Sequence, residues 1–537
     1  MYNKKNIYDQ LVSVFRKSVA RITVLNSLND ILPENIDFKF IFCEKSSEYD
    51  CYTNFINNLT FDHELTKLKY LRKVKHNLNH YRNIFAKVYT NTETGQIFFI
   101  FRKRFVNHYV LECSREKDKY GSSPNTKQFY VLSFCLNPLD FFNQNNAKIL
   151  VFINSLSKIY NFAGITINKE LFISDDYKIM YDLTKRVLLK YLDNLGRKLN
   201  KNAEENNLVV IHLAQELLRQ KETLFIDTKF IDGNIQNSEV KNELMEFVEK
   251  EMKNIINKTF ENLGIKFDLI SQRKNLKQFN FFEVFKTNFS KNLFVDEEQG
   301  TFFIDKQETK HLIENNAHEE LDLFYNIANI YLKIRRGTNK IILFFDNHET
   351  SKELENSIEV IDTEKVVEVL SVGLMETKKP EDTNLSSLIK TYGKNFLHWS
   401  ITSTPLENET KIKPNEKIFL ILQRTYSKTL FLLLKFKNHI QKQNFTKLKF
   451  LTTRSEHLIC IQIANFKNII SKIVKTKRIN YLNKYLLNFC VLVNEYFEEE
   501  KFSDYFDNPK KIFQKYLLVK SILQIFKNSF VLLGIKI

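Results

Sequence analysis

Residues 129–167 read FYVLSFCLNPLDFFNQNNAKILVFINSLSKIYNFAGITI, and this stretch decides the fold class of the chain. The apolar run at 129–134 predicts a buried strand, and residues 147–162 predict a helix that ends at Gly164. Residues 165–167 begin a second strand. A strand, a helix and a further strand in this order indicate the βαβ unit of a parallel sheet.

The same alternation continues towards the C-terminus. Residues 208–218, 240–263 and 321–334 predict helices, and 224–226, 265–270 and 340–345 predict strands. We therefore expect a Rossmann-like α/β middle domain over residues 116–405, although the chain has neither a GxGxxG fingerprint nor a P-loop.

The segment before this domain predicts an α+β domain over residues 1–115. Residues 6–30 have helical apolar spacing, and 84–89 with 97–101 predict a β-hairpin whose turn contains Gly95. Residues 67–82 (KLKYLRKVKHNLNHYR), which lie between this first helix and the hairpin, form a basic segment that is typical of a helix. Such a helix either contacts nucleic acid or has a solvated outer face.

The C-terminal segment predicts an all-α bundle over residues 411–537, with helices at 417–440, 458–475, 480–500 and 511–533. The chain has 537 residues and a net charge of +17, and residues 417–537 hold 22 Lys and Arg against 7 Asp and Glu, a net of +15. This charge belongs either to a solvated lysine-rich face or to a polyanion-binding domain. Because no lipidation signal is present, RNA or DNA is favoured over acidic lipid.

Composition excludes several classes of protein and site. A hydrophobic fraction of 43% is that of a globular chain, and no uncharged apolar run is long enough to span a membrane. The six cysteines form no CxxC pair, so we expect reduced core thiols in a cytosolic or nuclear protein, and no metal site. Of the two compartments, the cytoplasm is the expected one. His311 and His318 are expected on a helix, where an exposed polar face is favoured over a metal site.

Two motifs in the last helices resemble the DALR anticodon-binding domain. The first is Lys484-Tyr485-Leu486-Leu487-Asn488-Phe489 followed by Val493-Asn494-Glu495-Tyr496-Phe497. The second is Lys515-Tyr516-Leu517-Leu518-Val519-Lys520-Ser521 followed by Phe526-Lys527-Asn528-Ser529-Phe530-Val531-Leu532-Leu533-Gly534-Ile535. Lys515 stands where that family usually has Arg, and Ser529 stands where it usually has Gly.

The DALR domain is best known from arginyl-tRNA synthetases, and the middle domain is similar to theirs in outline. Aligning Gly164 with the glycine that ends the family's first Rossmann helix puts Asn143-Gln144-Asn145-Asn146 on the HIGH position. The chain has no HxGH spacing and no K-x-S-K. Since those histidines and that lysine stabilise charge on ATP phosphates, the resemblance implies a scaffold without catalytic residues and without a cofactor.

A degenerate synthetase body with a DALR domain is similar to the family of DALR anticodon-binding domain-containing protein 3. That resemblance implies a non-catalytic adaptor that binds arginine tRNAs through the anticodon arm and supports a tRNA 3-methylcytidine methyltransferase. The alternatives are a divergent arginyl-tRNA synthetase, which would use ATP, and a structural scaffold that binds no RNA.

The expected RNA-binding residues are all in the bundle. Asn494 and Tyr496 are expected either to touch the anticodon loop or to pack and bond within the bundle. The basic residues expected to contact RNA from exposed positions are Arg424, Lys428, Lys515, Lys520 and Lys527.

Overall fold

The computed structural model describes the chain except for a set of short segments. These are residues 1–5, 27–37, 44–47, 60–63, 139–140, 142, 176, 198–204, 232, 279–280, 346–347, 378–384, 413–415, 440–450, 503–507 and 537. The chain forms two compact units. The first unit comprises residues 1–123, 415–532 and 536–537, and the second comprises 124–414 and 533–535. The expected N-terminal domain and bundle thus share one unit, and the three-domain division stays a prediction.

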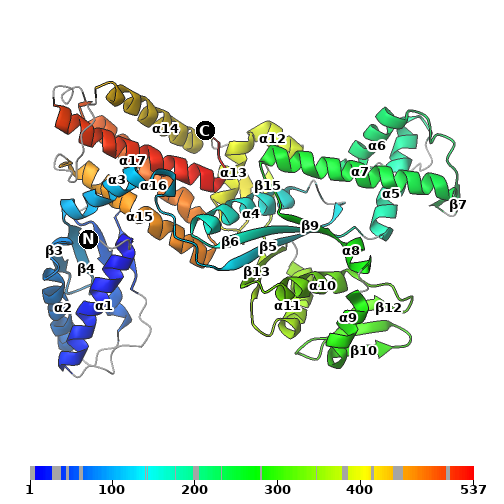
Figure 1. Cartoon of the computed structure of the whole chain (residues 1–537), viewed down its shortest axis with the longest axis horizontal. Helices are drawn as coiled ribbons and strands as arrows, with labels where there is room; N and C mark the ends of the chain where they lie inside the picture. The colour runs from blue at the N-terminus through cyan, green and yellow to red at the C-terminus, as the bar shows by residue number, and fades with distance from the viewer. Residues whose placement is uncertain are drawn as a thin grey trace. The chain divides into compact units, whose positions relative to one another are not determined.

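The second unit contains a five-stranded sheet in the order β14-β13-β5-β6-β9, in which all neighbouring strands are parallel. Helix α4 covers one face of the sheet, and α10 and α11 cover the other (Figure 1). The predicted strand–helix–strand order at 129–167 is confirmed as β5, α4 and β6. The bounds are β5 Phe129–Leu136, α4 Gln144–Phe162, β6 Thr166–Ile173, β9 Leu269–Gln272, α10 Asp322–Arg335, β13 Lys340–Phe345, α11 His348–Ile361 and β14 Val367–Ser371.

Between β6 and β9 the chain inserts a cluster of helices. These elements are α5 Tyr177–Asn194, α6 Leu208–Lys221, β7 Phe230–Ile231, β8 Asn234–Ile235 and α7 Ser238–Leu263. Asn207 and Asn237 cap the N-termini of α6 and α7 through their side chains, and Gly264 ends α7 with a φ of 64°. The strand expected at 224–226 is wrong, because this stretch forms turns in which the Leu224 amide bonds to Lys221 O.

The rest of the second unit is a small antiparallel sheet in the order β10-β11-β12 and several short elements. Their bounds are α8 Arg273–Gln278, α9 Phe281–Asn288, η5 Ser290–Asn292, β10 Leu293–Asp296, β11 Gly300–Ile304, β12 Lys310–Asn315, β15 Met375–Thr377, α12 Leu385–Tyr392, α13 Lys394–Thr402 and β16 Thr410–Ile412. The helix expected over His311 and His318 is wrong. His311 lies in β12 and bonds to Asp305, and His318 lies in the following turn with a φ of 58°.

The first unit contains a four-stranded antiparallel sheet in the order β1-β2-β4-β3. One face, with Phe40, Phe85 and Phe99, is buried together with Phe15 of α1. The opposite face carries half-buried aromatic residues. The bounds are α1 Ile7–Asn26, β1 Phe40–Phe42, β2 Cys51–Thr53, η2 Phe55–Asn58, α2 Glu64–Asn79, β3 Phe85–Thr90, β4 Ile97–Phe101, α3 Lys103–Glu116 and η3 Lys117–Lys119.

The same unit contains the helical bundle, whose helices are α14 Glu416–Lys437, α15 Arg454–Thr476, α16 Asn480–Glu499 and α17 Pro509–Leu533. The helices predicted for this region are therefore confirmed. Helix α15 begins with a capping box between Thr453 and Glu456 and packs on α3. Helix α17 is long and apolar enough to span a membrane, but 72% of its apolar window is buried inside the protein, as in a core helix.

Candidate nucleic-acid interface

One face of α14 is open to solvent and combines apolar and basic side chains. Phe431 is 58% exposed and Leu434 is 54% exposed, although both are large apolar residues. Arg424, Lys428 and Lys435 are exposed as well. Positions 424, 428, 431 and 435 follow one another at three- or four-residue steps, which places them on one side of the helix. We call these five residues the α14 outer face.

The chemistry of the α14 outer face suits single-stranded RNA. Lys435 Nζ lies 4.7 Å from the Phe431 ring centroid, and Lys428 Nζ lies 5.3 Å from that of Phe497. Cations neutralise phosphates, and an exposed aromatic ring stacks on bases. This is a surface on which a polyanion with unpaired bases can bind.

Asn494 and Tyr496 do not form the expected surface. Tyr496 is 0% exposed, and its ring packs against Phe497 and Phe502 with centroid distances of 5.8 and 5.6 Å. Asn494 is half-buried, and its Nδ2 donates to Thr425 Oγ1 at 2.9 Å, which ties α16 to α14. A base cannot stack on a buried ring, so the expectation that Tyr496 contacts RNA is wrong. The alternative of packing and bonding within the bundle describes both residues.

The expectation that Lys515 is an exposed RNA contact is also wrong. Its side chain is 2% exposed, and Nζ lies 2.5 Å from Glu456 Oε1 and 2.8 Å from Glu500 Oε1. The sequence pattern missed this because Glu456 is 59 positions away. Lys527 is exposed on α17, whereas Lys520 is half-buried. Burial and the nearby charge of Lys117 lower the pKa of Lys520.

A second surface of the first unit was not predicted from the sequence. Tyr52 in β2, Tyr89 in β3 and Phe98 in β4 lie on the open face of the four-stranded sheet, and Tyr49 packs beside them. The Tyr89 and Phe98 rings stack with centroids 5.1 Å apart, and Lys87 Nζ lies 5.5 Å from the Tyr89 centroid. We call these four aromatic residues the sheet platform. Aromatic residues on an open sheet are the feature that RNA-binding sheets use to stack bases.

The basic helix expected at 67–82 is present as α2, and its cations point outwards. Lys69, Arg72 and Lys73 are exposed, whereas Tyr70 and Val74 are buried. The expectation of a helix is confirmed. Whether its cations contact nucleic acid stays a prediction.

The HIGH-type position lies at the N-terminus of α4, directly after β5. Asn143 is the N-cap, and its Oδ1 accepts a bond from the Asn145 amide at 2.9 Å. Asn145 Oδ1 in turn accepts from the Met375 amide at 2.9 Å, while Gln144 is half-buried and Asn146 is buried. Two of these side chains are thus engaged in capping the helix and in holding β15. None of the four carries the charge that would stabilise a phosphate in a transition state.

A buried lysine follows this position in α4. Lys148 Nζ donates to Gly373 O at 2.8 Å and to Asn408 O at 2.6 Å. Burial lowers the pKa of Lys148 to about 8, against smaller opposing effects of Glu407 and Glu409. Its ammonium group therefore joins two loops. Among the residues that the structure describes, no group of three or more side chains could hold a metal ion.

The chain is similar in fold to arginyl-tRNA synthetases, and its C-terminal helices match an anticodon-binding domain. Residues 422–537 match the family model of the DALR anticodon binding domain. The arginyl-tRNA synthetase of Thermus thermophilus is 11% identical, with a TM-score of 0.71 over 98% of this chain and 99% of that chain. The arginyl-tRNA synthetase of Plasmodium falciparum is 13% identical, with a TM-score of 0.69, and the match covers 100% of this chain and 99% of that chain. The α/β middle region and the C-terminal helical DALR domain are thus those of the synthetase fold.

Curated relatives carry the same likeness along the whole chain. The arginine–tRNA ligase of Malacoplasma penetrans is 19% identical over 96% of this chain and 99% of its own length. The arginine–tRNA ligase of Mesomycoplasma hyopneumoniae strain 232 is 21% identical over 93% of this chain and 96% of its own length. The chain is therefore arginyl-tRNA synthetase-like and carries a DALR anticodon-binding domain, which supports tRNA binding.

Proposed function

We propose that this protein is a non-catalytic adaptor that binds arginine tRNAs through the anticodon arm and supports their 3-methylcytidine modification by a partner methyltransferase. The α14 outer face is the observation that carries the tRNA-binding part. All five of its residues lie within the DALR-matched residues 422–537, and it exposes Phe431 among Arg424, Lys428 and Lys435. The sheet platform offers a further stacking surface in the same compact unit.

The non-catalytic part of the proposal is supported by the chemistry at the start of α4. Adenylate formation develops negative charge on ATP phosphates, which calls for cationic or strongly polarised donors. The HIGH-type position instead offers Asn143, Asn145 and Asn146, and the neighbouring Lys148 ammonium is bound to two carbonyl oxygens. On this proposal no ATP is bound. The protein acts in the cytoplasm, in keeping with its six free cysteines.

The proposal also includes the family to which the protein belongs. A synthetase fold without the HIGH tetrapeptide and with a C-terminal DALR domain is similar to DALR anticodon-binding domain-containing protein 3. The methyltransferase partner and the preference for arginine tRNAs are inferred from that resemblance.

A divergent arginine–tRNA ligase is the second candidate, and one observation favours it. Relatives named arginine–tRNA ligase align over 93–96% of this chain, so the synthetase architecture is retained at full length. The discriminating experiment is arginine-dependent ATP–pyrophosphate exchange with the purified full-length chain. We expect no exchange above a no-enzyme control. Exchange that requires arginine would replace the adaptor proposal with the ligase.

The adaptor function is tested by capture from cells of the protein's source. The tagged full-length protein is isolated after crosslinking, the bound RNA is sequenced and co-purifying proteins are identified. We expect enrichment of arginine tRNAs and a tRNA methyltransferase, with tRNA binding that weakens steeply as salt rises. Recovery of the protein without bound tRNA contradicts the proposal. Bound tRNA that shows no enrichment of arginine isoacceptors contradicts it as well. A matched sample with Arg424→Ala and Lys428→Ala tests whether the α14 outer face is the site.

A further inference from the structure

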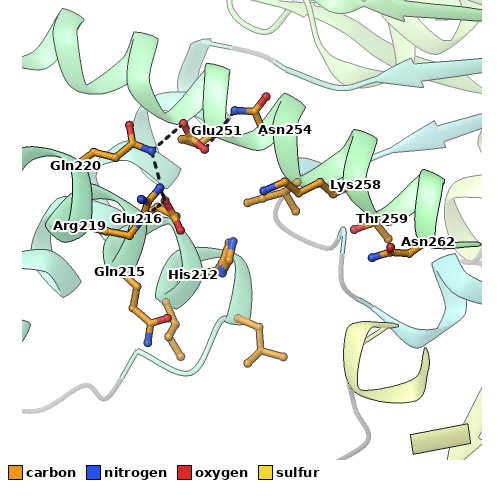
Figure 2. Close-up of a pocket in the computed structure, with 13 residues that line it drawn as sticks. His212, Gln215, Glu216, Arg219, Gln220, Glu251, Asn254, Lys258, Thr259 and Asn262 are labelled. Atoms are coloured by element: carbon orange, nitrogen blue, oxygen red, sulfur yellow. Dashed lines mark hydrogen bonds and ion pairs between the residues drawn. The ribbon is translucent and has the colours of Figure 1, made fainter. Parts of the chain in front are cut away.

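The polar side chains that line the cavity between α6 and α7, of about 610 Å³, bind one another. Glu216 forms an ion pair with Arg219 at 2.7 Å and accepts a hydrogen bond from Gln220 at 3.3 Å (Figure 2). Glu251 accepts bonds from Gln220 at 3.1 Å and from Asn254 at 3.3 Å. The carboxylates of this cavity thus have partners on its own walls. The small antiparallel sheet of the same unit differs in this respect.

This small sheet has one open edge in the described part of the chain. Its strand order is β10-β11-β12, so β10 lies at one side and β12 at the other. Glu320 forms a bridge with Glu314 of β12, which covers the β12 side. Among the residues that the structure describes, β11 is the only strand paired with β10. The outer edge of β10 therefore presents backbone N–H and C=O groups that a further strand can bind.

The side chains of β10 favour such pairing. Lysine and proline are common protections of an open edge, and neither stands within Leu293–Asp296, which reads LFVD. Phe294 is 38% exposed and Val295 is 70% exposed, although both are large and apolar. Covering them with a further strand removes apolar surface from water, which is favourable.

The exposed residues of β10 lie on both faces of the sheet, because side chains alternate along a strand. Phe294 shares a face with Phe302, whose ring centroid is 6.4 Å away, and Lys310 Nζ lies 3.4 Å from the Phe294 centroid. Leu293 is on the other face and packs against the core, and Val295 follows it on that side. A strand beside β10 would therefore meet apolar side chains on both faces.

The two ends of β10 carry opposite charges. Lys291 precedes the strand and Glu297 follows it, and both are exposed. If two copies of β10 pair antiparallel about a twofold axis that passes between the two Phe294 residues, Lys291 of each copy faces Glu297 of the other. Opposite charges that face each other across two strands stabilise the pair. The edge is thus complementary to itself.

The apolar residues select the same register. With the two Phe294 residues opposed, Leu293 of each copy faces Val295 of the other. With Val295 on the axis, Phe294 would face the carboxylate of Asp296, and with Leu293 on the axis, Val295 would face Lys291. Both of these shifted registers set an apolar side chain against a charge, which costs desolvation without an ion pair.

We propose that β10 is a self-association edge, at which two copies of this chain pair antiparallel through Leu293–Asp296 and join their small sheets into one continuous sheet. The self-complementary charges identify a second copy as the occupant, in preference to an unrelated extended peptide. A strand of four residues buries less than the roughly 1,200–2,000 Å² of a stable interface, so the association is reversible and increases with protein concentration.

Cysteine crosslinking of the full-length protein tests the register. Directly opposed residues of an antiparallel pair have Cα atoms about 4.5–5.5 Å apart, a distance that a disulfide can bridge. Under mild oxidation, Phe294→Cys should therefore form a covalent dimer on a non-reducing gel. Val295→Cys is the matched control and should not, because it faces Leu293 of the other copy. Dimer formation no greater than in the natural protein with its six free cysteines, or equal in the two variants, overturns the proposal.

Charge reversal tests the association without oxidation. Sedimentation velocity over a concentration series should show a reversible dimer of the natural protein. Lys291→Glu alone and Glu297→Lys alone set like charges against each other and should weaken the dimer roughly fivefold or more. The double variant should restore it, and Lys306→Glu, an exposed change outside β10, should have no effect. A monomer at every concentration, or a double variant that is as weak as the single ones, overturns the proposal.

Discussion

Lys515 Nζ and Glu500 Oε1 are 2.8 Å apart inside the helical bundle, where both side chains are almost fully buried. Glu456 reaches the same ammonium group from α15. One lysine thus joins α17 to the start of α15 and the end of α16. The position is where the DALR pattern usually has arginine, so a buried cation, and not an RNA contact, explains why a basic residue stands there.

The first prediction follows from this burial. Lys515→Ala leaves two buried carboxylates without their cation, and breaking a buried pair costs roughly 3–5 kcal/mol. Urea unfolding of the full-length protein should show this loss of stability. Lys510→Ala, an exposed change on the same helix, is the control and should stay within about 0.5 kcal/mol of the natural protein. Equal stability of the Lys515 variant and the control would mean that the ion pairs contribute nothing.

The second prediction concerns pH and His398. Burial lowers the pKa of His398 to about 4, and the charges of Lys394 and Lys158 contribute to the shift. The folded protein therefore keeps His398 neutral while the unfolded chain protonates near pH 6.5. The unfolded state binds more protons in this window, so stability falls as pH decreases from 6.5 to 4, by about 3 kcal/mol.

The variant His398→Gln isolates this contribution, because glutamine does not titrate. The difference in unfolding free energy between natural protein and variant should shrink by about 3 kcal/mol from pH 7 to pH 4. A constant difference across this range contradicts the assignment.

The side chain of His398 also restricts Gly534, whose φ is 76° and where an added Cβ would lie 2.5 Å from His398 Nδ1. Gly534→Ala should accordingly destabilise the protein at every pH.

The third prediction concerns catalysis. Asn143→His with Asn146→His should not produce arginine-dependent ATP–pyrophosphate exchange, since two imidazoles alone do not supply the lysine of a K-x-S-K loop. The double variant should instead lose stability, by about 1 kcal/mol, because Asn143 is the N-cap of α4. Thermal unfolding and the exchange assay, run on the same preparation, measure both. Exchange by the double variant would show that only the histidines were missing.

The bundle shows how much of the buried core can be predicted from helical periodicity. Tyr485, Phe489 and Phe497 of α16 follow one another at the spacing of one helix side, which by itself indicates a core stripe, and all three are buried. Tyr496 lies at the edge of that stripe, yet it is fully buried, because Phe502 and Lys515 cover this side of α16 as well. A repeat of 3.6 residues identifies one buried side of a helix. It does not tell whether a neighbour far along the chain covers a second side.

The same limit explains the surfaces that the sequence did not reveal. Alternation in β4 separates Phe99 from Phe98 but gives no sign of which face of the sheet stays open. In α14, the exposed Phe431 and Leu434 belong to an apolar rhythm that by itself predicts burial. The βαβ order at 129–167 was predictable because each element is local. Ion pairs such as those of Lys515, and the open faces, depend on the tertiary arrangement.

The fourth prediction tests the α14 outer face directly. Phe431→Ala removes an exposed aromatic ring, and loss of a base stack costs roughly 1–3 kcal/mol, so tRNA affinity should fall at least fivefold without loss of stability. Arg424→Ala with Lys428→Ala should weaken binding and reduce the slope of log affinity against log salt by roughly 0.7 for each phosphate that is no longer neutralised. Leu374→Ala, an equally exposed apolar change in the second unit, is the control. Filter binding over a salt series measures all three, and unchanged affinity in a folded Phe431→Ala protein would move the stacking surface to the sheet platform.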